Sequence, residues 1–313
     1  MLPAPLRALL CALPRAILIA LCLAAPPAFS AGVCDDFSAR LPNVKRAMCQ
    51  AAQLRVSSAK SVNGLPIYVR DVGPANAPLR VLVVGGIHGD EMSSASLALY
   101  WIGLAQGAPG NTRWRFVPAL NPDGLLAQPA TRVNANGVDL NRNFPTPNWA
   151  RDARIYWEKT TRKDPRRWPG KAPLSEPESR FLHSEMQRFK PHVIVSIHAP
   201  YGLLDFDGPT APPSRLGHLY LDQVGIYPGS LGNYGGVHNG MPVVTIELPS
   251  ALRTPLDAEM RQMWLDLERW MDERVAQGPS LSINGVSGVS GANSANGAHG
   301  VNGSRGAGDL LRR

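Results

Sequence analysis

Four side chains of the types that bind metal ions and transfer protons stand at the ends of apolar runs. His88 and Glu91 follow one run through a glycine-rich turn, His198 ends a second run, and Glu247 ends a third. Two histidines and one carboxylate form a full set of protein ligands for a catalytic zinc ion and leave the fourth position to water. A further carboxylate supplies the base that such a water needs. We therefore predict that His88, Glu91 and His198 bind one zinc ion and that Glu247 acts as a general base.

Another polar group lies between the first and last of these ligands. Asp139, Asn141 and Arg142 stand close together within residues 137–145, and Arg132 precedes them. A guanidinium beside an amide can hold a carboxylate through two hydrogen bonds. Asp139 is of the type that accepts the second ring proton of a zinc-binding histidine and so orients the ring. Arg132 is a candidate for stabilising charge on a scissile carbonyl oxygen, or else for an ordinary surface ion pair.

The elements that must position these side chains alternate between strand and helix patterns. Period-two alternation and apolar runs predict strands at residues 67–72, 80–84, 114–118, 193–197 and 243–247. Helical spacing predicts helices at residues 93–106, 175–189 and 255–275. Residues 125–174 are predicted to be mostly loop, because Pro, Asn and Arg are frequent there. This order indicates an α/β fold whose sheet carries helices on both faces and binds ligands at the carboxyl ends of its strands.

The two ends of the chain differ in composition from its body. Residues 1–30 have a basic start, a short apolar core and small residues before an expected cut ahead of Ala31, as in a secretory signal peptide. Because the apolar core is too short to span a bilayer comfortably, no membrane anchor is expected after cleavage. We predict a partly helical extension at residues 31–60 and a catalytic domain at residues 61–276. Residues 277–313 are rich in Gly, Ser and Asn, which predicts a disordered tail.

The cysteines and the net charge indicate the cellular location of the protein and the classes of partner it can bind. Removal of the signal peptide would leave Cys34 and Cys49, and an even number in an exported chain predicts one disulfide and a periplasmic or secreted location. The net charge of +8 includes a basic stretch at residues 151–167. That stretch predicts either a solvated loop or a contact with an acidic wall polymer or anionic substrate. Export argues against nucleic acid as a partner, and the oligomeric state is left open.

In their order and spacing the candidate residues resemble the funnelin-type zinc carboxypeptidases. The resemblance covers roughly residues 60–275 and implies a three-layer α/β/α sandwich with a mixed, mostly parallel central sheet. It further implies one zinc ion on the three ligands named above, Glu247 as general base and acid, and Arg132 as electrophilic stabiliser. Asn141 and Arg142 would then bind the terminal carboxylate of the substrate.

Within that family the chain most resembles the bacterial murein tripeptide amidase group, through residues 132–145, 228–234 and 245–249. Members of that group hydrolyse the bond from γ-D-glutamate to diaminopimelate in peptidoglycan peptides. The resemblance implies the same substrate class and the same zinc-assisted attack of water. The better-known members are cytoplasmic, whereas this chain carries an export pattern, so it would meet wall-bound or freshly released peptides.

Two further pairs of residues are candidates for contacts with the substrate. The resemblance favours Tyr234 over Tyr227 as an aromatic residue that lines the pocket, although either residue also suits a packing role. Asp205 and Asp207 follow the third ligand closely. They either meet the extra ammonium group of diaminopimelate or form a polar turn.

The sequence leaves three other functions open. One is a metallocarboxypeptidase that acts on ordinary C-terminal peptides. Another is a deacylase of N-acyl amino acids similar to aspartoacylase, which shares the His-x-x-Glu and Asp-x-Asn-Arg motifs. The export pattern and the short catalytic region argue against this function. The third is a non-catalytic protein that binds wall peptides, which the intact set of ligands and base disfavours.

Overall fold

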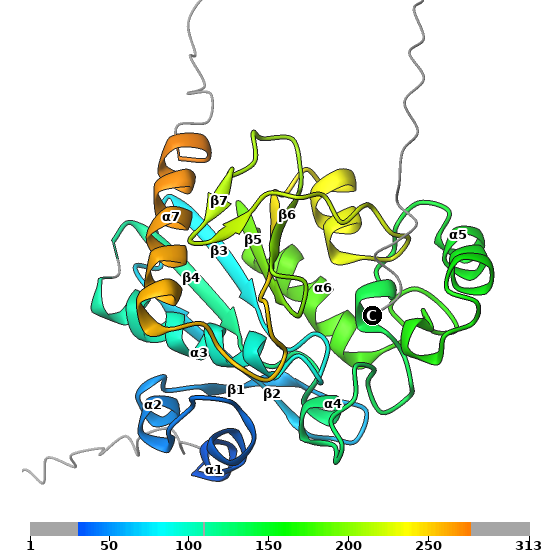
Figure 1. The fold of residues 1–313 in the computed structure, drawn as a ribbon, viewed down its shortest axis with the longest axis horizontal. Helices are drawn as coiled ribbons and strands as arrows, with labels where there is room; N and C mark the ends of the chain where they lie inside the picture. The colour runs from blue at the N-terminus through cyan, green and yellow to red at the C-terminus, as the bar shows by residue number, and fades with distance from the viewer. Residues whose placement is uncertain (1–30, 109, 277–313) are drawn as a thin grey trace, which may run out of the picture. The chain divides into compact units, whose positions relative to one another are not determined.

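A seven-stranded mixed sheet forms the centre of the protein (Figure 1). The computed structural model describes residues 31–108 and 110–276; the predicted signal peptide and the predicted tail lie outside the described residues. The strands follow in the spatial order β1-β2-β4-β3-β5-β9-β6. Their bounds are β1 Arg55–Lys60, β2 Pro66–Val72, β3 Leu79–Val84, β4 Thr112–Val117, β5 Val193–His198, β6 Leu203–Asp207 and β9 Val243–Glu247. A separate pair is formed by β7 Arg215–Leu216 and β8 Leu219–Tyr220.

The four central strands are parallel and the outer strands are antiparallel. β4, β3, β5 and β9 run in one direction, whereas β1, β2 and β6 pair antiparallel with their neighbours. The central strands β3 and β5 are buried almost throughout, which accounts for their near-continuous apolar sequences. The mixed sheet is therefore confirmed, with its parallel part confined to the centre.

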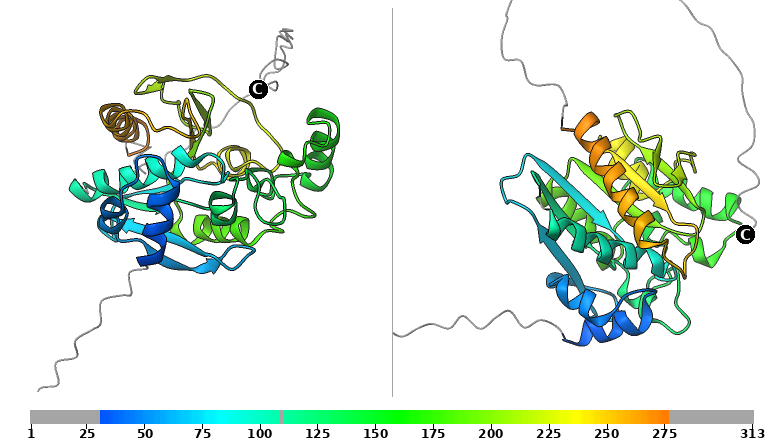
Figure 2. Two further views of the ribbon diagram at one scale, coloured as in Figure 1. Left: turned by 60° about the horizontal axis from the view of Figure 1, so that its bottom comes forward. Right: turned by 60° about the vertical axis from the view of Figure 1, so that its left-hand side comes forward.

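Helices cover both faces of this sheet (Figures 1 and 2). The helix bounds are α1 Ala31–Arg40, α2 Arg46–Ala51, α3 Met92–Gly107, α4 Pro122–Leu126, α5 Trp149–Ile155, α6 Pro177–Phe189 and α7 Asp257–Arg274. On β3, Val83 belongs to the hydrophobic core shared with α1, α2, α3 and α7. Its neighbour Leu82 belongs to a second core shared with α6. Because successive strand residues point to opposite faces, the two cores lie on the two sides of the sheet, and the predicted α/β/α layering is confirmed.

Short 3-10 and π helices lie in the connections between these elements. The 3-10 helices are η1 Leu140–Arg142 and η3 Pro165–Arg167, and the π helices are η2 Tyr156–Thr160 and η4 Gly232–His238. No helix among the described residues is both long and apolar enough to cross a membrane.

The structure differs from the sequence prediction in three segments. The extension at residues 31–60 contains α1 and α2, held by the Cys34–Cys49 disulfide, but its last part is the edge strand β1. The segment at residues 125–174, predicted as mostly loop, contains α5 and η2 in one continuous helical stretch. Strand β6 was not predicted. β1, β6 and the α5–η2 stretch are short and mix polar with apolar residues, so their sequences show no clear strand or helix periodicity. Contacts with residues distant in sequence decide their structure.

Candidate active site

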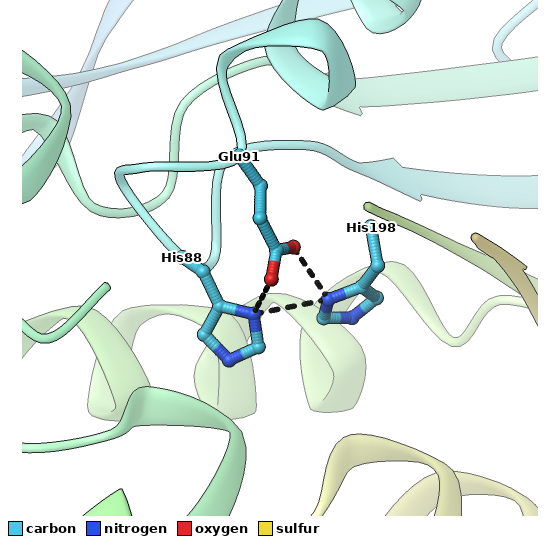
Figure 3. Close-up of side chains that lie close together, drawn as sticks. All are labelled: His88, Glu91 and His198. Carbon is cyan, nitrogen blue, oxygen red and sulfur yellow. Dashed lines mark hydrogen bonds and ion pairs between the residues drawn. The ribbon is translucent and has the colours of Figure 1, made fainter. Parts of the chain in front are cut away.

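The side chains predicted to bind zinc converge from two adjacent strands of the sheet (Figure 3). β3 leads to His88 through Gly85, where a Cβ atom would lie 2.7 Å from the carbonyl oxygen of Pro118, so glycine is required for this close approach. Glu91 immediately precedes α3, and His198 is the last residue of β5. Since β3 and β5 are parallel neighbours, their carboxyl ends bring the three side chains together.

The donor atoms of these side chains meet at one buried point. His88 Nδ1 lies 2.8 Å from Glu91 Oε1, and His198 Nδ1 lies 3.1 Å from Glu91 Oε2 and 3.1 Å from His88 Nδ1. All three side chains are buried, and one ligand atom from each lies within 4.8 Å of the others. Two imidazole nitrogens and a carboxylate that face one another are stabilised by a cation between them. The donor set fits a zinc ion.

The outer ring nitrogens are held by further hydrogen bonds. His88 Nε2 lies 3.1 Å from Asp139 Oδ1, and because a carboxylate only accepts, the Nε2 hydrogen is donated to Asp139. This leaves the lone pair of His88 Nδ1 directed at the donor cluster. His198 Nε2 lies 2.9 Å from Ser196 Oγ on the same strand. Such contacts orient the ring of a metal-binding histidine, and Asp139 occupies the position predicted for it.

Arg132 and Asp139 form a buried ion pair beside the donor cluster. Arg132 donates from Nε and Nη2 to Asp139 Oδ2 at 3.2 Å each, and from Nη1 to Glu91 Oε1 at 3.1 Å. Burial opposes ionisation of Asp139, but the charge of Arg132 and the hydrogen bond from His88 outweigh it and hold the pKa of Asp139 well below its usual value. For Glu91, burial is likewise outweighed by His88 and His198, which lower its pKa. The predicted surface alternative for Arg132 is thereby excluded, since only 8% of this residue is exposed.

Glu247 lies next to the donor cluster on the neighbouring strand. It is the last residue of β9 and pairs in register with His198 of β5. The side chain is buried, and its Oε2 atom has no hydrogen-bond partner among the described residues. Burial raises the pKa of Glu247 to about 7, with the charge of His198 acting in the opposite direction. A carboxyl group with this pKa can accept and return a proton at neutral pH.

Asn141 and Arg142 lie in η1, directly after Asp139. Asn141 Oδ1 accepts a hydrogen bond from the Leu231 backbone at 2.8 Å, which ties η1 to the start of η4. The guanidinium of Arg142 is buried, forms no ion pair among the described residues and has an unpartnered Nε atom. Its centre lies 4.6 Å from the ring of Tyr227 and 5.6 Å from the ring of Tyr156. A buried guanidinium that lies close to two aromatic rings and forms no ion pair can bind an anion.

Comparison with known proteins places this arrangement in a family. The Peptidase M14 family model, described as zinc carboxypeptidase, matches residues 45–204. The chain belongs to the zinc carboxypeptidase family. It is therefore a zinc hydrolase whose metal site is formed by His88, Glu91 and His198.

Individual relatives of this zinc carboxypeptidase agree with that assignment. Murein peptide amidase A from Escherichia coli K12 is 36% identical over 218 residues, which cover 67% of this chain and 88% of that protein. Murein peptide amidase A from Vibrio campbellii is 32% identical and covers 70% of this chain and 85% of that protein. Among solved structures, carboxypeptidase A from Helicoverpa armigera has a TM-score of 0.54 at 16% identity, covering 71% of this chain and 69% of that one. That last likeness concerns the fold alone.

The two candidate tyrosines occupy different surroundings in the zinc carboxypeptidase. Tyr227 stacks against Arg142 and donates its hydroxyl hydrogen to the Val224 carbonyl oxygen at 2.6 Å. The ring of Tyr234 instead packs against Phe144 and His183, with centroids 5.9 and 5.5 Å apart. The structure thus places Tyr227, and not the preferred Tyr234, beside the arginine predicted to bind substrate. The order of residues gave no signal for this, since both tyrosines lie in the same interval.

Asp205 and Asp207 lie on β6, next to the strand that carries Glu247. Asp205 pairs in register with Thr245 and Asp207 with Val243, on the sheet face that also carries Glu247. Burial raises the pKa of both carboxyl groups, that of Asp207 to about 6 with Asp205 contributing. Neither forms an ion pair among the residues described. The polar-turn alternative does not describe them, because both belong to a strand of the central sheet.

Sequence reasoning left open whether the basic stretch at residues 151–167 is a solvated loop or a contact with an anionic substrate, and it missed that this stretch packs against the site. Tyr156 of η2 stacks on Tyr227 with ring centroids 5.4 Å apart. The Trp168 carbonyl oxygen accepts a hydrogen bond from the backbone of Asp139 at 2.8 Å. Arg166 pairs with Asp90, which lies between the ligands of the first loop. Aromatic residues among the cations were the available signal that this segment packs against the site.

Proposed function

We propose that this protein is an exported exopeptidase that hydrolyses peptidoglycan-derived peptides at the bond from γ-D-glutamate to diaminopimelate. Two relatives named murein peptide amidase A match it over most of their lengths. The substrate class is inferred from these relatives, and the exo-acting character from the site itself. Peptidoglycan-derived peptides are the proposed substrates.

The observation that carries the proposal is the buried Arg142 without an anionic partner among the described residues. An enzyme that cleaves only at a chain end must recognise the free terminal carboxylate. A guanidinium donates two parallel hydrogen bonds to a carboxylate, and the Asn141 amide lies on the same short helix. A substrate held there would present its last amide bond at a fixed distance from the donor cluster.

The residues around the donor cluster divide the chemistry among them. Zinc held by His88, Glu91 and His198 supplies Lewis acidity, which polarises a carbonyl group and lowers the pKa of water. Glu247 accepts the proton of the attacking water and returns it to the departing amine, because a pKa near 7 suits both transfers. Arg132 is positioned by Asp139 to stabilise negative charge on the scissile carbonyl oxygen.

Two further elements of the proposal concern the substrate side chain and the compartment. Asp205 pairs with Thr245, two residues before Glu247, and forms no ion pair among the described residues, so it would meet the distal ammonium group of diaminopimelate. Asp207 pairs with Val243 at the opposite end of β9 and is too far along the strand for this contact. The sequence pattern of residues 1–30 and the Cys34–Cys49 disulfide support a periplasmic or secreted location. N-terminal sequencing of protein from the extracytoplasmic fraction should then begin at Ala31.

The decisive experiment is mass spectrometry of L-Ala-γ-D-Glu-diaminopimelate incubated with the purified protein, with and without a zinc chelator. The expected result is release of free diaminopimelate that the chelator abolishes and added zinc restores. Arg142→Met should raise KM strongly, and a C-terminally amidated substrate should resist cleavage by the unmodified protein. Absence of release by a protein shown to contain zinc would refute the substrate assignment. Cleavage of ordinary C-terminal peptides or of N-acyl amino acids would then identify the alternative.

A further inference from the structure

The short helix η3 and the residue that follows it each make one contact with residues of the active site. Arg166 Nη2 lies 2.8 Å from Asp90 Oδ2, and Asp90 stands directly before the ligand Glu91 in the chain. On the other side the Trp168 carbonyl oxygen accepts the backbone hydrogen of Asp139 at 2.8 Å. Arg167 lies between these two anchors, and its backbone nitrogen donates to the Asp164 carbonyl oxygen at 3.0 Å. The backbone of Arg167 is therefore held close to the active site by the contacts of its two neighbours.

The guanidinium of Arg167 is partly buried and has no described partner. Among residues 31–108 and 110–276, no ion pair or side-chain hydrogen bond involves it, whereas Arg166 is paired. Its charge reaches Tyr227: burial raises the pKa of that hydroxyl, and the charges of Arg142 and Arg167 both oppose the rise. Arg142 lies 4.6 Å from the same ring. The charges of two guanidinium groups therefore act on the Tyr227 hydroxyl, and neither group forms an ion pair among the described residues.

Two partly desolvated cations that form no ion pair and act on the same tyrosine are unfavourable in the free protein. The arrangement becomes favourable when two negative charges bind. Arg142 accounts for one of them, the terminal carboxylate of the substrate. A single carboxylate would leave Arg167 without a partner, although contacts of its two neighbours hold its backbone beside the site.

We infer that Arg167 binds a second carboxylate of the substrate, so that the enzyme selects peptides with two carboxylates close to the scissile bond. The inference rests on the proposed function and specifies its substrate class. The tripeptide L-Ala-γ-D-Glu-diaminopimelate offers two sources of this group. One is the distal carboxylate of diaminopimelate, and the other is the α-carboxylate of the γ-linked glutamate, which a γ bond leaves free.

Three substrates separate these sources. The first is the full tripeptide, the second has lysine in place of diaminopimelate and so lacks the distal carboxylate, and the third has the glutamate α-carboxylate converted to an amide. Each is assayed with the unmodified protein, with Arg167→Gln and with Arg162→Gln. Arg162 is exposed and belongs to the same basic segment, so it serves as the matched control.

For the full tripeptide, Arg167→Gln should lower kcat/KM about 10- to 100-fold, the range for one hydrogen bond between charged groups, mainly through KM. With the unmodified protein, the substrate that lacks the bound carboxylate should have a lower kcat/KM than the full tripeptide. Arg167→Gln should not lower the kcat/KM of that substrate further, and this identifies which carboxylate Arg167 binds. Arg162→Gln should match the unmodified protein throughout. Free diaminopimelate should also bind more weakly to Arg167→Gln in calorimetry if the distal group is the one bound.

The outcomes distinguish this inference from the proposed function. Hydrolysis of all three substrates, with Arg167→Gln either silent or equally harmful to each, would overturn the role of Arg167 and leave the proposed function standing. Hydrolysis of none of them by the zinc-loaded protein would overturn the proposed function and this inference together. A circular dichroism spectrum identical to that of the unmodified protein excludes misfolding of the variant as the cause of a loss.

Discussion

Replacement of Asp139 by asparagine tests whether the buried pair with Arg132 organises the zinc centre. Asp139 is fully buried and accepts hydrogen bonds from His88 Nε2 at 3.1 Å, from two nitrogens of Arg132 at 3.2 Å each, and from the Asn141 backbone at 3.0 Å. Asparagine keeps one acceptor oxygen, so its NH2 group must face either the His88 ring hydrogen or the Arg132 guanidinium. The negative charge is lost while Arg132 stays buried.

Removal of one partner of a buried ion pair costs about 3–5 kcal/mol of folding free energy. Loss of the contact that orients a zinc-binding histidine lowers metal affinity about 10- to 100-fold. We therefore expect Asp139→Asn to lose about 3–5 kcal/mol in urea unfolding of the metal-free protein. Its zinc affinity, measured by competition with a fluorescent chelator, should fall by the factor given above. Asp152→Asn removes an exposed ion pair with Arg151 and should change neither quantity measurably.

The pH dependence provides a second check on Asp139→Asn. Because the pKa of Asp139 is lowered in the folded protein, its stabilisation is fully present above the unfolded pKa of about 3.9 and is lost only as pH falls through the lower folded value. The difference in stability between the two proteins should thus persist from neutral pH to about pH 4 and narrow in stronger acid. A loss below about 1 kcal/mol, together with unchanged zinc affinity, would refute the reasoning.

Three other substitutions probe the site and the fold. Glu247→Gln should retain zinc by elemental analysis but lose about 10²- to 10⁴-fold in kcat, because the amide cannot accept a proton. Asp207→Asn should be more stable than the unmodified protein at pH 7 and equal to it below about pH 4 in urea unfolding. The folded pKa of Asp207, raised to about 6 by burial and by Asp205, means that stability falls as pH rises from the unfolded value to 6. Exchange of both Cys34 and Cys49 for serine should cost roughly 3 kcal/mol in the same assay, since the bridge closes a loop of 15 residues.

Each of these expectations has a contradicting result. Turnover by Glu247→Gln within about tenfold of the unmodified protein would exclude it as the general base. A stability of Asp207→Asn below that of the unmodified protein at pH 7 would mean that an undetected donor supports the carboxylate. If the serine double variant and the unmodified protein with its disulfide intact have the same free energy of unfolding, the disulfide does not stabilise the N-terminal helices.

The strands and the donor types of the metal site were accessible from the sequence because their signals are local. An apolar run predicts a buried strand whatever surrounds it, and β3, β5 and β9 lie within one residue of their predicted bounds. Polar residues directly after such runs must lie at strand ends. Adjacent parallel strands then bring His88, Glu91 and His198 together, which is why the donor set was predicted correctly.

The surroundings of those donors were decided by the tertiary structure. Tyr227 lies beside Arg142 because the segment that leads into η4 folds back onto η1. The residues around Arg167 contact Asp90 and Asp139, which are distant in sequence. No periodicity records such contacts, so the sequence favoured Tyr234 and treated the basic segment as one that could be solvated loop. The pKa of Glu247 depends likewise on burial, which only the packed sheet supplies. Sequence alone determined which chemical groups stand at the strand ends, since that depends on local pattern. Their ionisation and their neighbours were fixed only when the folded chain excluded water and brought distant segments together.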